Sequence, residues 1–206
     1  MTVHIDYTTE ETLGNIFTTA NFTDELHKYL GLDPAVSSAN QPIDVDELLT
    51  SVLHIVEQDQ QRVILEKTVT LTLPYYALNA CDNKIFLPYG SVASLTSFAY
   101  EDADDASQTL ASGNYTIFSN EPAFIWAENW WSVLTLSSTN PLPITITYTT
   151  GYDAFAKIPR STLQAIRILC YHHYVNRGQE DMAIPRAYNH HMEQGVLGHA
   201  RLQEFM

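Results

Sequence analysis

The hydrophobic periodicity of the chain changes twice, and this constrains the fold most. Between about residues 44 and 61, apolar side chains recur every three or four positions, as on one face of a helix. From Val69 to Leu73, apolar residues alternate with threonine, which is the pattern of a half-buried strand. Helical spacing returns from Pro159 to Arg177. Since the two periods suit different backbones, helical segments must flank a strand-rich middle.

The spacing predicts a short helix ending before Gly31, a long helix from Asp44 or Asp46 to Gln61, and a third helix after Pro159. Strands are predicted at 69–73, 84–87, 94–100, 115–118, 123–127, 132–136 and 144–148. Short strands separated by turns favour antiparallel pairing. The predicted fold class is therefore α+β: a small helical bundle of two N-terminal helices and a C-terminal helix, with an inserted antiparallel β-rich region and an extended C-terminal tail.

We expect one domain over residues 1–206, divided into four parts. These are an N-terminal helical part (1–61), a β-rich insertion (62–156), a C-terminal helix (157–178) and a tail (179–206). The first part holds eleven acidic residues and one basic residue, whereas residues 157–206 hold four acidic and six basic residues. With a net charge of -14, the chain lacks the clustered lysines and arginines needed to grip nucleic acid phosphates.

Sequence signals for catalysis are missing. The chain contains no Gly-x-Ser-x-Gly, no phosphate-binding glycine loop and no His-Glu-x-x-His motif. Adjacent histidines such as His190 and His191 point about 100° apart on a helix and chelate a metal poorly. We expect no enzyme activity, no metal and no cofactor; a metal-dependent enzyme built on His190, His191 and His199 is a rival hypothesis.

An aromatic cluster and an acidic loop are the candidate contact features. Trp126, Trp130 and Trp131 allow two interpretations. In one, Trp126 is core and the other two cap the sheet at a turn; in the other, the cluster binds a protein or a carbohydrate as part of a β-rich binding module. The loop from Glu101 to Asp105 lacks the glycine and terminal glutamate of a calcium loop and is expected to be a solvated turn.

The N-terminus lacks the features of a secretory signal, and no apolar run reaches the roughly 18 residues of a membrane span. We expect a soluble protein made in the cytoplasm. Cys81 and Cys170 lie in segments of different type, so no disulfide is expected between them.

Several short strings, in this order and spacing, resemble the head-tail connector (adaptor) proteins of long-tailed double-stranded DNA phages. The resemblance covers about residues 22–178. The strings are Asp46-Glu-Leu48-Leu49; Ile85-Phe-Leu87-Pro88 with Val92, Leu95 and Phe98; Tyr100-Glu-Asp102; Gly113-Asn-Tyr115; Ile144-Thr-Ile146-Thr-Tyr148 with Gly151-Tyr152; and Ile158-Pro159, Ala165, Ile168-Leu169, Tyr174 and Asn176-Arg177.

The resemblance implies a virion structural protein of the neck, assembled in the host cytoplasm. Copies would form a dodecameric ring beneath the portal protein, would meet a stopper or tail-completion protein, and would let DNA pass without binding it or a membrane. The implied portal-docking arm is in the tail, with candidates Tyr188, Leu197, Arg201 and Phe205. The implied tail-side or inter-subunit candidates are Asp102, Asp104, Asp105, Trp130 and Trp131.

Overall fold

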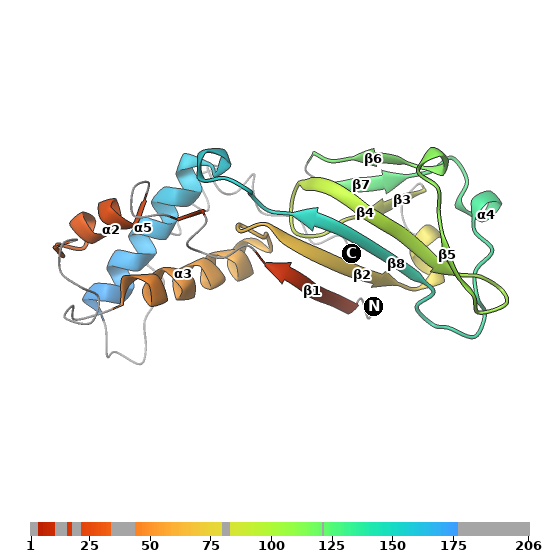
Figure 1. The fold of residues 1–206 in the computed structure, drawn as a ribbon, viewed down its shortest axis with the longest axis horizontal. Coiled ribbons are helices and arrows are strands. Elements are labelled where there is room, and N and C mark those ends of the chain that lie inside the picture. The colour runs from red at the N-terminus through yellow and green to blue at the C-terminus, as the bar shows by residue number, and fades with distance from the viewer. Residues whose placement is uncertain are drawn as a thin grey trace. The chain divides into compact units, whose positions relative to one another are not determined.

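The chain folds into two compact units, which are described separately (Figure 1). The computed structural model describes residues 4–10, 16–17, 22–33, 44–79, 83–120 and 122–176. The β unit comprises Met1–Glu10 and Glu66–Gly151, and the helical unit comprises Glu11–Leu65 and Tyr152–Met206. The α+β class, with an antiparallel β region inserted between helices, is confirmed.

The described residues of the helical unit include the α-helices α2 (Asp24–Tyr29), α3 (Val45–Gln60) and α5 (Arg160–Val175). Helix α3 begins where predicted because the Asp44 carboxylate accepts hydrogen bonds from the backbone N–H groups of Asp46 and Glu47, at 3.0 and 3.4 Å. It ends at Gln61, which adopts a left-handed backbone with φ of 51°.

Helix α5 packs against α2 and α3 (Figure 1). Its buried residues recur every three or four positions and meet the apolar face of α3 in one core. A short 3-10 helix, η5 (Phe155–Lys157), precedes α5 and brings Phe155 against Phe17 and Phe22. The core is made of Ile16, Phe17, Phe22, Leu26, Leu30, Val45, Leu48, Leu49, Val52, Leu53, Val56, Ile64, Leu65, Ile158, Leu163, Ala165, Ile166, Leu169 and Cys170.

The larger sheet of the β unit has five antiparallel strands in the order β1-β2-β8-β4-β5. They are β1 (His4–Glu10), β2 (Lys67–Leu73), β8 (Ile144–Thr150), β4 (Val92–Glu101) and β5 (Ser107–Thr109). Alternation sets the two faces: Leu71 opposite Ile146 is buried, whereas Thr70 opposite Thr147 points to the other face and is half-buried.

The smaller sheet has three antiparallel strands in the order β3-β7-β6. They are β3 (Lys84–Phe86), β7 (Phe124–Trp126) and β6 (Thr116–Phe118). Ile85 and Ile125 are buried in the same core as Leu71, Phe98 and Ile146 of the larger sheet. The β unit is thus a sandwich of two sheets, completed by η3 (Tyr75–Asn79), η4 (Ser112–Asn114) and α4 (Trp130–Val133).

Two predicted elements are wrong. Residues 4–10 were expected in the helical part but form β1, because they pair with β2, about sixty positions away in the sequence. The strand predicted at 132–136 is replaced by the helical turn α4, in which the Leu134 N–H donates to the Trp130 carbonyl at 2.9 Å. The predicted tail, 179–206, lies outside the described residues. None of the described helices is both long and apolar enough to cross a membrane.

Candidate interaction surfaces

The acidic loop joins β4 to β5, and its carboxylates bind the protein's own backbone and side chains. Asp102 Oδ1 accepts hydrogen bonds from the backbone N–H groups of Asp104 and Ala106, both at 3.0 Å. Asp102 Oδ2 accepts another from the Gln108 side chain at 2.8 Å. The Gln108 bond first, and then the backbone bonds, lower the pKa of Asp102. This carboxylate therefore shapes the hairpin.

Asp105 ties the same loop to the segment that follows α4. Its Oδ1 accepts hydrogen bonds from the hydroxyls of Ser137 and Thr139, at 2.5 and 2.6 Å. These two bonds lower the pKa of Asp105, with that from Ser137 contributing most. The Glu101 carboxylate accepts a further hydrogen bond from the same segment, donated by the Asn140 side-chain amide at 2.6 Å. Of the three predicted aspartates, Asp102 and Asp105 thus hold the loop through hydrogen bonds, and Asp104 and Asp105 are both exposed.

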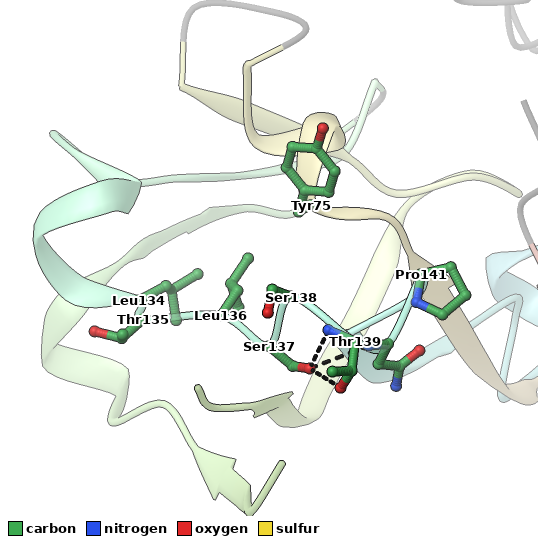
Figure 2. A pocket seen from close by; sticks show the side chains of 9 residues that line it. Tyr75, Leu134, Thr135, Leu136, Ser137, Ser138, Thr139 and Pro141 are labelled. Atoms are coloured by element: carbon green, nitrogen blue, oxygen red, sulfur yellow. Dashed lines mark hydrogen bonds between the residues drawn. The ribbon is translucent and has the colours of Figure 1, made fainter. Parts of the chain in front are cut away.

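A shallow groove runs beside this segment, with a volume of about 710 Å³. Figure 2 shows Tyr75 across from residues 134–141, and both line the groove. The Ser137 hydroxyl is held at 3.0 Å from that of Thr139, and it also accepts the Thr139 N–H at 3.1 Å. Tyr75 is the one titratable side chain among the residues that line the groove, so the lining offers no paired acid and base.

The three tryptophans are arranged differently from the expectation. Trp130 is fully buried, its ring stacks on Phe98 at 5.5 Å, and its indole N–H donates to the Asn83 carbonyl at 2.9 Å. Trp126 is 37% exposed. Trp126 as core and Trp130 as a contact residue are therefore both wrong, since the burial is reversed. Trp131 is the second residue of α4, and its side chain lies outside the described part.

Trp126 belongs to an exposed aromatic surface that sequence reasoning did not identify. We call this surface the aromatic face; it is the outer side of the three-stranded sheet and consists of Lys84, Phe86, Thr116, Phe118, Phe124 and Trp126. The register places Phe86, Phe124 and Phe118 in one row across the strands. Each lies two positions along its strand from Lys84, Trp126 or Thr116, which form the next row. The sequence shows that aromatic residues alternate along these segments. It does not show that β3 pairs with β7, which brings the rings together.

The helical unit carries a smaller exposed apolar area where α2 lies beside α5. Tyr29 and Tyr171 make an edge-to-face contact at 5.8 Å, and both are nearly half exposed. Nearby on α5, Arg167 forms an ion pair with Glu25, and its guanidinium lies 5.1 Å from the centre of the Phe22 ring. The Arg167 contacts join α5 to α2.

A buried arginine joins the two stretches where the chain leaves and re-enters the helical unit. The Arg62 guanidinium donates to the Tyr152 hydroxyl at 3.1 Å, and the Tyr152 N–H donates to the Ile64 carbonyl at 2.9 Å. Burial lowers the pKa of Arg62. The Glu57 carboxylate accepts the Ile64 N–H at 2.7 Å and so holds the same stretch from α3.

The remaining sequence candidates lie outside the described residues. These are the portal-docking arm residues Tyr188, Leu197, Arg201 and Phe205, and the histidines His190, His191 and His199. Within the described part of the chain, no group of three or more His, Cys, Asp or Glu side chains is arranged to hold a metal ion.

Comparison with known proteins gives a match in structure and none in sequence. No family model matches the sequence, and no curated protein does. Among solved structures, a chain in the neck of an empty gene transfer agent particle, computed with C6 symmetry, matches with a TM-score of 0.72 at 17% identity, over 98% of this chain and 97% of the other. A chain in the virion of a native gene transfer agent particle matches with a TM-score of 0.71, at the same identity and coverage. A chain in the native neck, computed with C12 symmetry, matches with a TM-score of 0.69, again at that identity and coverage.

The match defines the class of fold. This chain has the fold of a protein found in the neck of a gene transfer agent particle, over almost its full length. At 17% identity the likeness concerns the fold.

Proposed function

We propose that this chain is a structural protein of a virion neck, a head-tail connector that forms a ring beneath the portal. In this role it completes the head, joins it to the tail and leaves a channel for DNA. Its partners are further copies of itself, in a dodecameric ring, the portal protein, and a stopper or tail-completion protein. The chain acts in the virion, after assembly in the host cytoplasm, without enzyme activity or a cofactor.

One observation carries the proposal: the fold agrees over 98% of the chain with a protein from a particle neck. The agreement includes both the helices and the inserted sheets, so it does not rest on a common small motif. The neck structures have C6 and C12 symmetry, which supports a ring of copies around an axis. The sequence strings that resemble phage connectors support the same role without reference to the structure.

The charge of the chain fits a protein that surrounds DNA without holding it. The chain has 24 acidic and 10 basic residues. An acidic channel repels phosphates, whereas a basic one would retain them as the genome passes.

The burial of Trp130 argues against the rival function, carbohydrate binding through Trp126, Trp130 and Trp131. Trp130 has no exposed surface and cannot stack on a sugar ring. Trp126 is exposed, but its neighbours on the aromatic face are mostly phenylalanines, which offer no hydrogen bonds to sugar hydroxyl groups.

The proposal is tested by purifying particles from the organism that encodes this chain and quantifying their proteins by mass spectrometry. We expect the chain at a ratio of one copy per copy of the portal protein. A full-length tagged chain should also recover the portal protein from a particle lysate. Particles that lack the chain would overturn the proposal.

A further inference from the structure

The aromatic face departs from the pattern expected of a solvent-exposed antiparallel sheet. Such sheets place apolar residues on the core side and polar residues on the other. In the three-stranded sheet the core side has Ile85 and Ile125, both buried as expected, and Ile117 of the outermost strand β6, which is 38% exposed. The other side has a row of three phenylalanines and a tryptophan, of which Phe118 is 46% and Trp126 is 37% exposed.

The three phenylalanines and Lys84 of this face contact one another. The rings of Phe118 and Phe124 are stacked with centroids 4.5 Å apart, and that of Phe86 lies 5.8 Å from Phe124. The Lys84 ammonium lies 5.3 Å from the centre of the Phe124 ring. Rings held in this way present a large contact area and lose little conformational entropy when a partner binds.

The partner of such a face should be a protein with carboxylates near its apolar contact. The three strands contain one charged residue, Lys84, and no acidic residue. Within the described part of the chain, no carboxylate pairs with Lys84, whose ammonium lies over a ring. Nucleic acid would stack on the rings, but a single lysine in so acidic a chain gives its phosphates too little attraction.

A further copy of the chain fits this description. Its charge of -14 provides carboxylates over much of the surface, and residues 1–61 alone contain eleven acids against one base. Exposed examples are Asp44, Asp46 and Glu47 at the start of α3. Copies with so large a like charge repel one another, so their association needs apolar contact and a matching cation, and the aromatic face provides both.

We propose that the aromatic face is a contact between neighbouring copies of this chain in the assembled ring. The inference rests on the proposed function, because it assumes that the copies form a ring. In a ring the contact is heterologous: the aromatic face of one copy meets a different surface on the next, and every copy uses both surfaces. Phe118 and Trp126, as the most exposed rings, bury the largest new area, and Lys84 meets a carboxylate of the neighbour.

The contact is tested by placing the photo-cross-linking amino acid p-benzoylphenylalanine at position 118 of the full-length chain and purifying particles. After irradiation, we expect an adduct with twice the mass of one chain, whose peptides all come from this chain. The matched control carries the same amino acid at position 75, because Tyr75 is 54% exposed on η3 of the same unit, outside the aromatic face. The control should give no adduct between two copies.

The outcomes separate this inference from the proposed function. If the chain is in the particles but position 118 cross-links only to another particle protein, or to nothing, the inference is overturned and the neck function stands. If the chain is absent from the particles, the neck function is overturned together with the ring contact. A cross-link to DNA at position 118 would equally overturn the inference.

A pair of substitutions gives a second readout. Phe118→Ser combined with Trp126→Ser should leave a folded chain, checked by circular dichroism, that enters particles about tenfold less than the wild type or worse, since central aromatic residues dominate most interfaces. The control Tyr75→Ser should enter normally. Normal entry of the double variant would overturn the contact; if the double variant is unfolded, the cross-linking result decides.

Discussion

The two sheets of the β unit bury similar residues and expose very different ones. On the five-stranded sheet, the side away from the core is largely threonine and serine: Thr68, Thr70 and Thr72 of β2 lie opposite Thr149, Thr147 and Thr145 of β8. On the three-stranded sheet, the corresponding side is aromatic. In both sheets, alternate residues of each strand face the core, so folding alone does not explain the different outer sides. The difference concerns what each outer surface contacts. The threonine side suits solvent, and the aromatic face suits a partner.

A similar difference separates the helical unit from the β unit. Helices α3 and α5 bury one apolar stripe each in a core that belongs to the helical unit alone. The β unit has a separate core between its two sheets, and Asp105 holds its acidic loop to Ser137 and Thr139.

The reactivity of the Cys170 thiol measures the unfolding of the helical unit. Its side chain is buried in that core, and burial raises the pKa of the thiol to about 12. In a Cys81→Ser background, a thiol reagent at pH 8 should therefore label Cys170 only when the helical unit unfolds. The labelling rate should be reduced by a factor that corresponds to the free energy of unfolding of the unit, about 5–15 kcal/mol. Labelling as fast as in denaturant would contradict the buried position of Cys170.

Trp130 and Trp126 separate the core from the aromatic face. Trp130→Ala should destabilise the β unit by about 3–5 kcal/mol, because it removes a buried ring and leaves a cavity. Trp126→Ala should cost less than about 1 kcal/mol, because this ring is partly exposed. Thermal unfolding followed by circular dichroism measures both. Equal losses of stability in the two variants would contradict the difference in burial between Trp130 and Trp126.

Arg167 joins two helices at the surface of the helical unit. Arg167→Ala should lower the stability by about 1 kcal/mol or less, since it removes an exposed ion pair with Glu25 and a contact over the Phe22 ring. Arg160→Ala is the matched control: this arginine is exposed in the first turn of the same helix. Denaturant unfolding should show a larger loss for Arg167, and no difference between the variants would contradict its role.

The smallest effect concerns the acidic loop. Hydrogen bonds from Ser137 and Thr139 lower the pKa of Asp105, so their contribution to stability is present above the ordinary aspartate pKa of about 3.9 and is lost as the pH falls through the lowered value. Ser137→Ala should raise the pKa of Asp105, measured from its carboxyl carbon in an NMR titration. The control Ser138→Ala, which removes the neighbouring exposed hydroxyl, should leave the pKa of Asp105 unchanged.

Much of the fold was predictable from local patterns. Helix α3 was predicted to within about two residues because Asp44 caps it and its apolar residues keep helical spacing. Strands β2, β3, β4, β6, β7 and β8 were each found near their predicted places, since alternation and turn residues are local signals. Strand β1 was missed because what makes it a strand is its pairing with β2, far along the chain.

The candidate surfaces were harder to predict, for a physical reason. Trp126 and Trp130 are four residues apart, and nothing local distinguishes the ring that is buried from the one that is exposed. Their burial depends on Phe98, which stacks on Trp130, and on the rows formed by β3, β7 and β6. The acidic loop was expected to be a solvated turn and Asp105 is exposed, but its bonds to Ser137 and Thr139 were not predictable because these residues lie more than thirty positions away.

The measurement that tests the central claim most directly is a cryo-electron microscopy reconstruction of the neck in purified particles. We predict a ring of this chain between the portal and the tail, with twelve copies, as the C12 symmetry of a similar neck suggests. Density for the side chains should fit both the helical unit and the β unit. A neck in which that ring is built from a different protein, with this chain absent, would contradict the account.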